Sequence, residues 1–508
     1  MPALYHLLPF FLLHLPLGVD SKRDSDKAGL RIRLTQQGID YAAGLGRNLL
    51  QHQLPKVHFP RVSAKVTQGP GFGNALLYNV SVDEFEVPEF SYVLLPGSGM
   101  QWNSRGGHVS VSGLWDAWYK VLIRARLSGS IEASASDINL ELVSEIKQGP
   151  NGSLPFVNIT YCSADIGQFS ISIEGGVVQW FVNLFRGLIA DKLRVLLQDE
   201  ICRAASGDTA NQHIQTLPTE IPIYRPFTLH YGLTSPPLVA EHFIQTEMEA
   251  EITWAGQHTP LRPPTLPEVV IPESSPRMLY LTGSDYVLNS FLYSAHKHKA
   301  IQFLLTSHML PPTMDKFLHT TCKVMCIGKV IPAIGDKFPN ATLDAHLYTT
   351  KRAPRAEVHA NGARINASIN TDIYASPMGA HPTHPGKVFT INILLQAELV
   401  PLVSDGRVSA NLSIEELKLS PGASAIGPIP PASLLLLQNI LKPAIQEYAN
   451  SHLNRGIAIP TVQGVRLVDA ELELAERAVS ISTDIAYDPA ALLALLSTQP
   501  KQASEQPL

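Results

Sequence analysis

A proline-rich stretch divides the chain into two halves that repeat one order of elements. Residues 254–278 read WAGQHTPLRPPTLPEVVIPESSPRM. Proline lacks a backbone N–H and holds φ near −65°, so this stretch is expected to run extended as a linker. On each side of it, a helical segment is followed by alternating segments and by a second, more apolar helical segment. Two related domains of about 200 residues each are therefore expected, rather than one large core.

Helical periodicity opens and closes each half. Apolar residues recur at three- and four-residue spacing over residues 34–54, within IRLTQQGIDYAAGLGRNLLQHQL, and over residues 175–202, GGVVQWFVNLFRGLIADKLRVLLQDEIC. The second half begins with LYLTGSDYVLNSFLYSAHKHKAI and ends its helical pattern at 428–453, PIPPASLLLLQNILKPAIQEYANSHL. Both opening segments carry an Asp-Tyr pair, which supports a shared plan.

Segments with a period of two lie between these helices. GSIEASASDINLELVSEI and GRVSANLSIEELKLS alternate in the manner of half-buried antiparallel strands. Residues 224–254 and 465–489 are also strand-like and belong to neither helix-bounded unit, so they are expected to pair with each other in a sheet shared by both halves. The predicted domains are an N-terminal unit at 22–220, central strands at 221–253, the linker at 254–278, a C-terminal unit at 279–456, returning strands at 457–488 and a tail at 489–508.

The first 21 residues favour export. Their apolar run, Leu7 to Leu17, is too short to cross a bilayer core of about 30 Å, so a signal peptide at 1–21 is expected, although its basic n-region is missing. A buried N-terminal helix is the alternative. No later stretch has the roughly 18 apolar residues of a membrane span. A secreted, extracellular glycoprotein is expected, because six N-x-[ST] acceptors are present: Asn79, Asn151, Asn158, Asn340, Asn366 and Asn411.

Four cysteines fit an oxidising compartment. Cys162 follows a strand-like segment and Cys202 closes a helix, so a bridge between them would stabilise the fold by about 4 kcal/mol on the chain-entropy estimate. Two buried thiols are the alternative. Cys322 and Cys326 would bridge on a helix, but on a strand they lie about 13 Å apart, and their neighbours look β-like; no bridge is expected. A metal site is not expected either, because His296, His298 and His319 have no recognisable spacing to these cysteines.

The order of these features resembles a known family. The stretches that carry the likeness are GLRIRLTQQGIDYAAG, the segment YCSADIGQFSISIE with the helix after it, RMLYLTGSDYVLNS, IPAIGDKFPNATLDAHL and LNRGIAIPTVQGVRLVDAELEL. Together they resemble the family of the bactericidal/permeability-increasing protein, the lipopolysaccharide-binding protein and the cholesteryl ester and phospholipid transfer proteins. The likeness covers nearly the whole mature chain and contains no catalytic signature.

This resemblance implies an α+β fold: a boomerang of two barrel-like domains, each a twisted antiparallel sheet with long helices, joined by a central antiparallel sheet. It also implies an apolar tunnel in each barrel with a bound phospholipid, and no other cofactor. The alternative for any one of these residues is an ordinary solid core. In the N-terminal domain the expected lining residues are Leu34, Gly38, Tyr41, Ala42, Leu45, Leu49, Val178, Phe181, Phe185, Leu188 and Ile189. In the C-terminal domain they are Tyr286, Leu288, Leu437, Ile440, Leu441 and Ala444.

Lipopolysaccharide binders of this family present a basic tip on the N-terminal domain, and seven cations occupy comparable stretches here. They interleave with Trp115, Trp118 and Tyr119, a mixture suited to lipid A or another anionic membrane surface, where each nearby cation adds about 1 kcal/mol. An ordinary solvated rim is the alternative. The seven cations are Lys56, Arg61, Lys65, Arg105, Lys120, Arg124 and Arg126.

Overall charge limits the functional classes. Residues 22–220 hold 18 Lys and Arg against 19 Asp and Glu, so long-range attraction to a bacterial surface is expected to be modest, which puts bactericidal action in doubt more than lipid binding. A net charge of −5 without a basic run argues against nucleic-acid binding. The expected protein is a lipid-binding monomer that recognises lipopolysaccharide or anionic lipid in innate defence against Gram-negative bacteria.

Two other functions remain open. The tail DPAALLALLSTQPKQ resembles, weakly, the C-terminal helix that gates the tunnel of cholesteryl ester transfer protein, so phospholipid or neutral lipid transfer is the main alternative. An esterase is a remote one. The chain contains no G-x-S-x-G elbow, H-E-x-x-H, P-loop or dinucleotide glycine motif, so no enzyme is expected.

Overall fold

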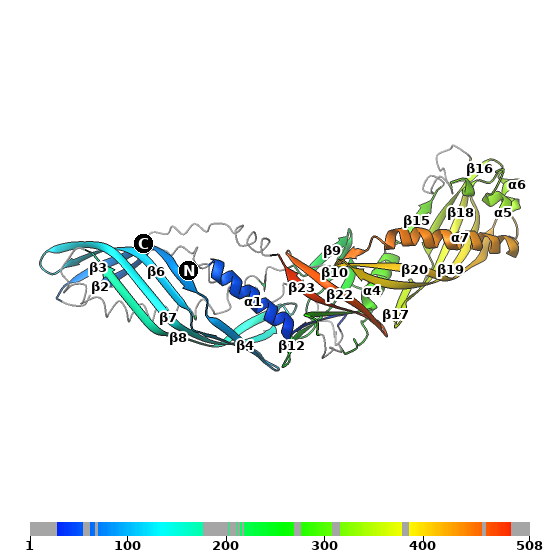
Figure 1. The fold of residues 1–508 in the computed structure, drawn as a ribbon. Coiled ribbons are helices and arrows are strands. Elements are labelled where there is room, and N and C mark those ends of the chain that lie inside the picture. The colour runs from blue at the N-terminus through cyan, green and yellow to red at the C-terminus, as the bar shows by residue number, and fades with distance from the viewer. Residues whose placement is uncertain are drawn as a thin grey trace.

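The computed structural model describes a long molecule with two sheet-based bodies at opposite ends of a central sheet (Figure 1). The described residues are 28–53, 61–66, 70–175, 202, 211, 214–215, 218–268, 276–306, 315–377, 386–459 and 464–488. The expected signal peptide, most of the helix at 175–202 and the tail at 489–508 lie outside these residues. Among the described residues, no helix combines the length and the apolarity that crossing a membrane requires.

Six antiparallel strands form the central sheet, in the order β11-β12-β1-β14-β23-β22. Strand β1 lies between β12 and β14, and two arginines of β1 donate to side chains of β12: Arg31 to the Glu247 carboxylate at 2.8 Å and Arg33 to the Gln245 side-chain oxygen Oε1 at 2.7 Å. Both arginines face their register partners, so they fix the alignment of the two strands. The six strands are β1 (Leu30–Thr35), β11 (Leu238–Val239), β12 (Phe243–Met248), β14 (Leu279–Ser284), β22 (Val465–Ala475) and β23 (Ala478–Tyr487).

The pairing expected for the central sheet needs correction. From 224–254, only β11 and β12 share this sheet with the strands of 465–489, and they do not pair with them because β1 and β14 lie between; residues 227–230 and 251–254 belong to a separate three-stranded sheet. The first strand of each half supplies these two middle positions. Leu34, expected at the start of a helix, is a residue of β1, because pairing with Ile244 and Leu279 on the flanking strands holds the backbone extended.

The proline-rich linker packs onto this central sheet. Residues 261–268 contain no helix or strand, as expected, and the Pro267 carbonyl accepts a hydrogen bond from Arg31 at 2.7 Å. Leu266 is buried with Ala28 and Ala478. Just before the linker lies a three-stranded sheet made of β9 (Glu220–Tyr224), β10 (Phe227–His230) and β13 (Glu251–Trp254).

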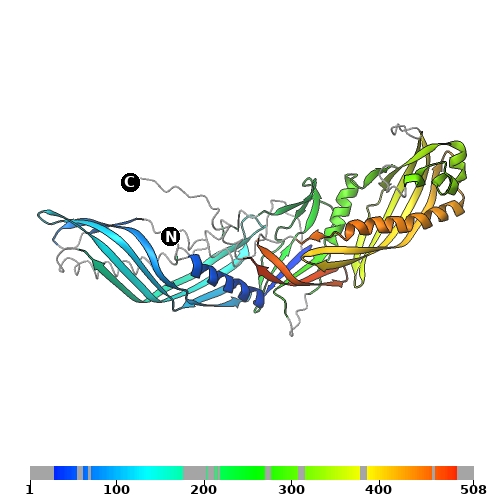
Figure 2. The ribbon, with the colours of Figure 1, turned by 45° about the horizontal axis from the view of Figure 1, so that its top comes forward.

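The N-terminal body is a seven-stranded antiparallel sheet with helix α1 (Gln36–Gln53) between it and the central sheet (Figure 2). The strand order is β2-β3-β6-β7-β5-β4, with β8 on the free side of β7. The Tyr41 hydroxyl accepts a hydrogen bond from the Tyr487 backbone N–H at 3.0 Å, which joins α1 to β23. The strands are β2 (Val62–Val66), β3 (Phe72–Glu86), β4 (Glu89–Leu95), β5 (Gly99–Arg105), β6 (His108–Lys120), β7 (Arg124–Gln148) and β8 (Pro155–Glu174).

The C-terminal body repeats this plan, with helix α7 lying along its sheet (Figure 1). The side-chain amides of Gln446 and Asn450 bond the backbone of β20 at Ile414 and Leu412, so the helix covers polar groups at the strand edge. The strands are β15 (Gln302–Leu305), β16 (Ala341–Thr349), β17 (Arg355–His359), β18 (Gly362–Pro377), β19 (Lys387–Ser404), β20 (Arg407–Ser424) and β21 (Ile457–Ala458). The helices are α4 (Tyr286–Lys297), η5 (Asp315–Leu318), α5 (Ile327–Val330), α6 (Pro332–Lys337) and α7 (Pro431–Leu453).

Both pairs of cysteines form disulfides. The bridge expected between Cys162 and Cys202 is present. The expectation that Cys322 and Cys326 stay unbridged is wrong: they are bonded, with Cα atoms 6.0 Å apart. Residues 322–326 form bends ahead of α5 and not a strand, so the strand span that argued against a bridge does not apply.

Candidate functional site

The β6–β7 hairpin ends in three exposed apolar residues between two cations. Lys120 and Arg124 pair in register, and the residues between them, Val121, Leu122 and Ile123, are 47%, 91% and 85% exposed. Arg124 is the first residue of β7. Twenty residues further along this strand, a span of roughly 65 Å at full extension, Ser144 pairs with Met100 beside the central sheet. The hairpin therefore lies at the outer end of the N-terminal body (Figure 1).

Aromatic rings of β3 and β6 pack in the strand rows next to this apex. Phe72, which is 55% exposed, pairs in register with Lys120 and packs edge-to-face on Trp118 with ring centroids 5.9 Å apart. The Arg124 guanidinium lies 4.2 Å from the centre of the Trp118 ring. A cation over an aromatic face is held electrostatically, so Arg124 is oriented before any ligand arrives.

Four of the expected cations gather in the last rows of the sheet. Lys65 pairs with Asn74, Asn74 with Trp118, and Trp118 with Arg126, which places Lys65 and Arg126 in one row across four strands. Lys120 and Arg124 occupy the end row. Among the described residues, no acidic side chain lies in these rows. This end of the sheet is thus locally basic even though the N-terminal half is nearly neutral. We call Lys65, Phe72, Trp118, Lys120, the apolar apex at 121–123, Arg124 and Arg126 the N-terminal tip.

The remaining expected cations behave differently. Arg61 is exposed just ahead of β2. Arg105 is not brought to the tip: it pairs with Glu89 at the end of β5, and its neighbour Ser104 pairs with Leu140, sixteen residues along β7 from Arg124. Lys56 lies outside the described residues. The apolar apex was not anticipated from the sequence, although the run of three apolar residues at 121–123, which interrupts the alternation between two cations, is the signal that marks it.

Of the eleven residues expected to line an N-terminal tunnel, five have side chains in the described part of the chain and six do not. Leu34 is buried with Ile39 and Leu279 in the core beside the central sheet, and Gly38 is buried on α1. Tyr41, Ala42 and Leu45 on α1 are half-buried. The side chains of the other six expected residues lie outside the described part of the chain: Leu49, Val178, Phe181, Phe185, Leu188 and Ile189.

In the C-terminal body, the expected residues of α7 lie together and those of α4 lie apart. Leu437 is buried in the core that α5, α6 and the sheet share, and Ile440 and Leu441 pack against it. Ala444 is half-buried one turn further along. Tyr286 is buried at the start of α4, and Leu288 is half-buried two residues later.

The acceptor asparagines of the six sequons lie mainly on the surface. Asn158 is half-buried, and its side-chain amide donates to Glu145 at 3.2 Å. The other five are exposed: Asn79, Asn151, Asn340, Asn366 and Asn411.

A buried polar cluster lies beside the three-stranded sheet. Glu251 is fully buried, and its carboxylate accepts hydrogen bonds from His258 Nδ1 at 2.6 Å and from the Thr259 backbone N–H at 2.5 Å. Burial by itself raises the pKa of Glu251, but these hydrogen bonds outweigh it, so the net pKa lies below the usual value. Glu249 completes a group of three side chains with metal-ligand atoms within 4.8 Å of one another. Because Glu251 is already bonded within the protein, we assign the cluster a structural role.

The architecture defines a class: a boomerang-shaped α+β protein of two antiparallel-sheet domains joined by a central sheet. The model of the N-terminal domain of the LBP / BPI / CETP family matches residues 38–217, and that of the C-terminal domain matches residues 223–487. The chain belongs to the LBP / BPI / CETP family, as its sequence patterns indicated.

Individual relatives extend the likeness along most of the chain. A bactericidal permeability-increasing protein of Sebastes schlegelii is 25% identical over 464 residues, covering 90% of this chain and 95% of its own length. The lipopolysaccharide-binding protein of Homo sapiens is 23% identical over 495 residues, covering 96% and 99%. The crystal structure of a lipopolysaccharide binding protein superposes with a TM-score of 0.51 at 22% identity, covering 91% of this chain and 99% of that one, which supports the fold.

Proposed function

We propose that this protein is a secreted, monomeric lipid-binding protein of innate defence. Its N-terminal tip contacts lipopolysaccharide of Gram-negative bacteria or another anionic lipid surface, and its domains hold phospholipid in apolar tunnels. The observation that carries the proposal is the β6–β7 hairpin, in which Leu122 and Ile123 are exposed between Lys120 and Arg124.

The hairpin matches the chemistry of a membrane interface. Fully burying a Leu or Ile side chain stabilises by about 1.5–3 kcal/mol, and each cation beside anionic lipid adds about 1 kcal/mol. While the apolar apex is exposed to water, it contributes none of this free energy of burial. In contact with lipid A or an anionic bilayer, the apex enters the acyl layer while Lys120 and Arg124 remain at the phosphates. Because the N-terminal half is nearly neutral, this local cluster supplies the electrostatic attraction.

The relatives and the composition support the rest of the proposal. Two of the similar proteins are named for increasing bacterial permeability and for binding lipopolysaccharide. Phospholipid is the expected internal ligand, because sequestering a dozen methylenes of an acyl chain offers roughly 10 kcal/mol before ordering costs. We assign no catalytic activity, and an assay on a panel of acyl esters checks this.

Binding of tip variants tests the proposal. Leu122→Asp with Ile123→Asp is expected to weaken binding to lipopolysaccharide and to phosphatidylglycerol vesicles at least about tenfold. Lys120→Gln with Arg124→Gln is expected to weaken it about thirtyfold at low salt and less at high salt, since salt screens the charges it removes. Ile457→Asp is the control, because Ile457 is 72% exposed on β21, away from the tip. Wild-type affinity in both tip variants would refute the assignment.

Lipid transfer is the second candidate, because the matching family model also bears the CETP name. Deleting residues 489–508 is expected to slow exchange of phospholipid between vesicles if the tail gates a tunnel. Salt-independent exchange of neutral lipid, with no preference for lipopolysaccharide, would favour transfer over recognition of bacterial lipid.

A further inference from the structure

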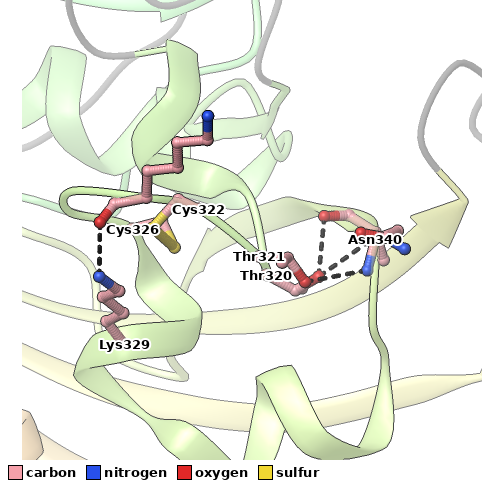
Figure 3. Close-up of a disulfide and its surroundings, with 8 residues drawn as sticks. Thr320, Thr321, Cys322, Cys326, Lys329 and Asn340 are labelled. Atoms are coloured by element: carbon pink, nitrogen blue, oxygen red, sulfur yellow. Dashed lines mark hydrogen bonds between the residues drawn. A yellow bond between two sulfur atoms is a disulfide. The ribbon is translucent and has the colours of Figure 1, made fainter.

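A second exposed apolar loop lies at the outer end of the C-terminal body. The disulfide between Cys322 and Cys326 closes it just ahead of α5, and only Lys323, Val324 and Met325 lie between the cysteines (Figure 3). Val324 is 84% exposed and Met325 is 50% exposed. We call residues 322–326 the disulfide loop.

Several bonds besides the disulfide fix this loop on the body. The Thr320 hydroxyl donates to the Ala341 carbonyl at 3.0 Å and accepts from the Ala341 N–H at 2.9 Å. Lys329 donates from Nζ to the Lys323 carbonyl at 2.7 Å (Figure 3). Cys326 is fully buried and its carbonyl accepts the first hydrogen bonds of α5. The outward position of Val324 and Met325 is therefore set by the surrounding structure.

Close backbone packing adds to this rigidity. Gly328 lies against the Thr320 carbonyl so closely that a Cβ at residue 328 would be 1.7 Å from that oxygen. The Asn340 N–H donates to the Thr321 hydroxyl at 3.1 Å on the other side (Figure 3). Val324 and Met325 are thus held exposed to water, and their apolar surface yields a favourable free energy of burial only when a binding partner covers it.

Lysines are the charged residues nearest to the loop in the sequence. Lys316, Lys323 and Lys329 are exposed, and the stretch from 316 to 335 contains no acidic residue, although Asp315 and Asp336 flank it. Two apolar side chains at the apex of a short convex loop offer little area to a shaped protein surface. A fluid bilayer adapts to such an apex, and anionic headgroups complement the lysines.

We propose that the disulfide loop is a second membrane contact, which inserts Val324 and Met325 into the interface of an anionic phospholipid bilayer with Lys316, Lys323 and Lys329 at the headgroups. This contact is separate from the N-terminal tip and does not depend on it. The two contacts lie at opposite ends of the elongated molecule (Figure 1).

Vesicle binding in a protein with a disabled N-terminal tip isolates this contact. The parent protein is the full chain carrying Leu122→Asp and Ile123→Asp, freed of N-glycans because the Asn340 sequon adjoins Thr321. The probe is a vesicle of equal parts phosphatidylcholine and phosphatidylglycerol. Adding Val324→Asp and Met325→Asp is expected to lower the remaining binding about tenfold. The control pair is Leu402→Asp with Ile457→Asp, which changes two exposed apolar residues of the same body.

A direct probe of insertion avoids any question of folding. In the same parent, Met325→Trp adds a fluorescent side chain to the loop. Vesicles that contain acyl-brominated phosphatidylglycerol are expected to quench this fluorescence, whereas vesicles made of brominated phosphatidylcholine alone are not. Absence of that quenching, together with unchanged binding by the aspartate variant, would overturn the proposal. If the aspartate pair instead changes self-association in sedimentation experiments and leaves vesicle binding unchanged, the loop is a contact between copies of the chain, which also overturns it.

Discussion

Two histidines, His230 and His258, lie beside the three-stranded sheet among the carboxylates of Glu220, Glu249 and Glu251. The His230 ring contacts Thr253 through Nε2 at 2.9 Å and Glu220 through Nδ1 at 3.3 Å, and its centre is 5.4 Å from that of His258. Burial lowers the pKa of His230, and the neighbouring glutamates offset this only in part. His298, which directly follows helix α4, stacks on Trp254 with ring centres 5.1 Å apart.

Acidification is therefore expected to destabilise the protein in two steps. An unfolded histidine takes up a proton near pH 6.5, whereas folded His230 resists protonation, so the unfolded chain binds more protons below that pH and stability falls. The depressed pKa of Glu251 works at lower pH, because its contribution is lost as the pH falls through its folded value. His230→Gln is expected to reduce the fall in melting temperature between pH 7.5 and pH 5.5. His242→Gln, at a side chain 75% exposed, is the control, and equal pH dependence in wild type and His230→Gln would contradict the assignment.

Single residues also show where sequence reasoning succeeds. The bridge from Cys162 to Cys202 was predictable because a helix end and a strand each offered one cysteine. The bridge from Cys322 to Cys326 was not, because the conformation of that segment depends on the bonds of Thr320 to Ala341, a partner 21 residues away. Alternation of residue types carries no information about such a contact.

At the scale of elements, two of the glycines in helix α1, Gly38 and Gly44, have contrasting surroundings. A Cβ at residue 38 would be 2.7 Å from the Met278 carbonyl oxygen and 2.6 Å from Leu34 Cδ1, whereas a Cβ at residue 44 would meet nothing within 4 Å. Gly38 therefore permits close approach of α1 to the start of β14, and Gly44 only weakens the helix.

Alanine at these two positions should have opposite effects. Gly38→Ala is expected to destabilise the protein, because the carbonyl of Met278 is backbone and cannot move aside cheaply. Gly44→Ala is expected to stabilise it by about 0.5–1 kcal/mol through helix propensity. Urea unfolding of the two variants measures both effects. Stabilisation by both substitutions would show that α1 is not seated closely against β14.

Helix periodicity located α1 and α7 to within a few residues, since each helix repeats its apolar positions over several turns. Strand β1 was missed because Leu34 also fits the apolar stripe of α1. Only the long-range pairing with β12 and β14 distinguishes the two conformations, and six residues are too few for the period alone to do so. The N-terminal tip was found in part: four of its cations were expected from the family resemblance, but the register that separates Arg105 from Arg124 was not predictable.

At the scale of the whole molecule, the two bodies share a plan and differ in what holds their outer ends. The N-terminal tip is an open hairpin supported by Phe72 and Trp118, whereas the disulfide loop is closed covalently. The doubled order of helix and strands on each side of the proline-rich linker was enough to predict two domains, because each helix must bury its apolar face against a sheet of its own half.

Native mass spectrometry of the full chain, purified without detergent and freed of N-glycans, would show whether this fold carries lipid. We expect a protein mass increased by one or two phospholipids, which are released on denaturation and identified in the organic extract. Only the mass of the bare chain, together with no uptake of a fluorescent phospholipid, would contradict it.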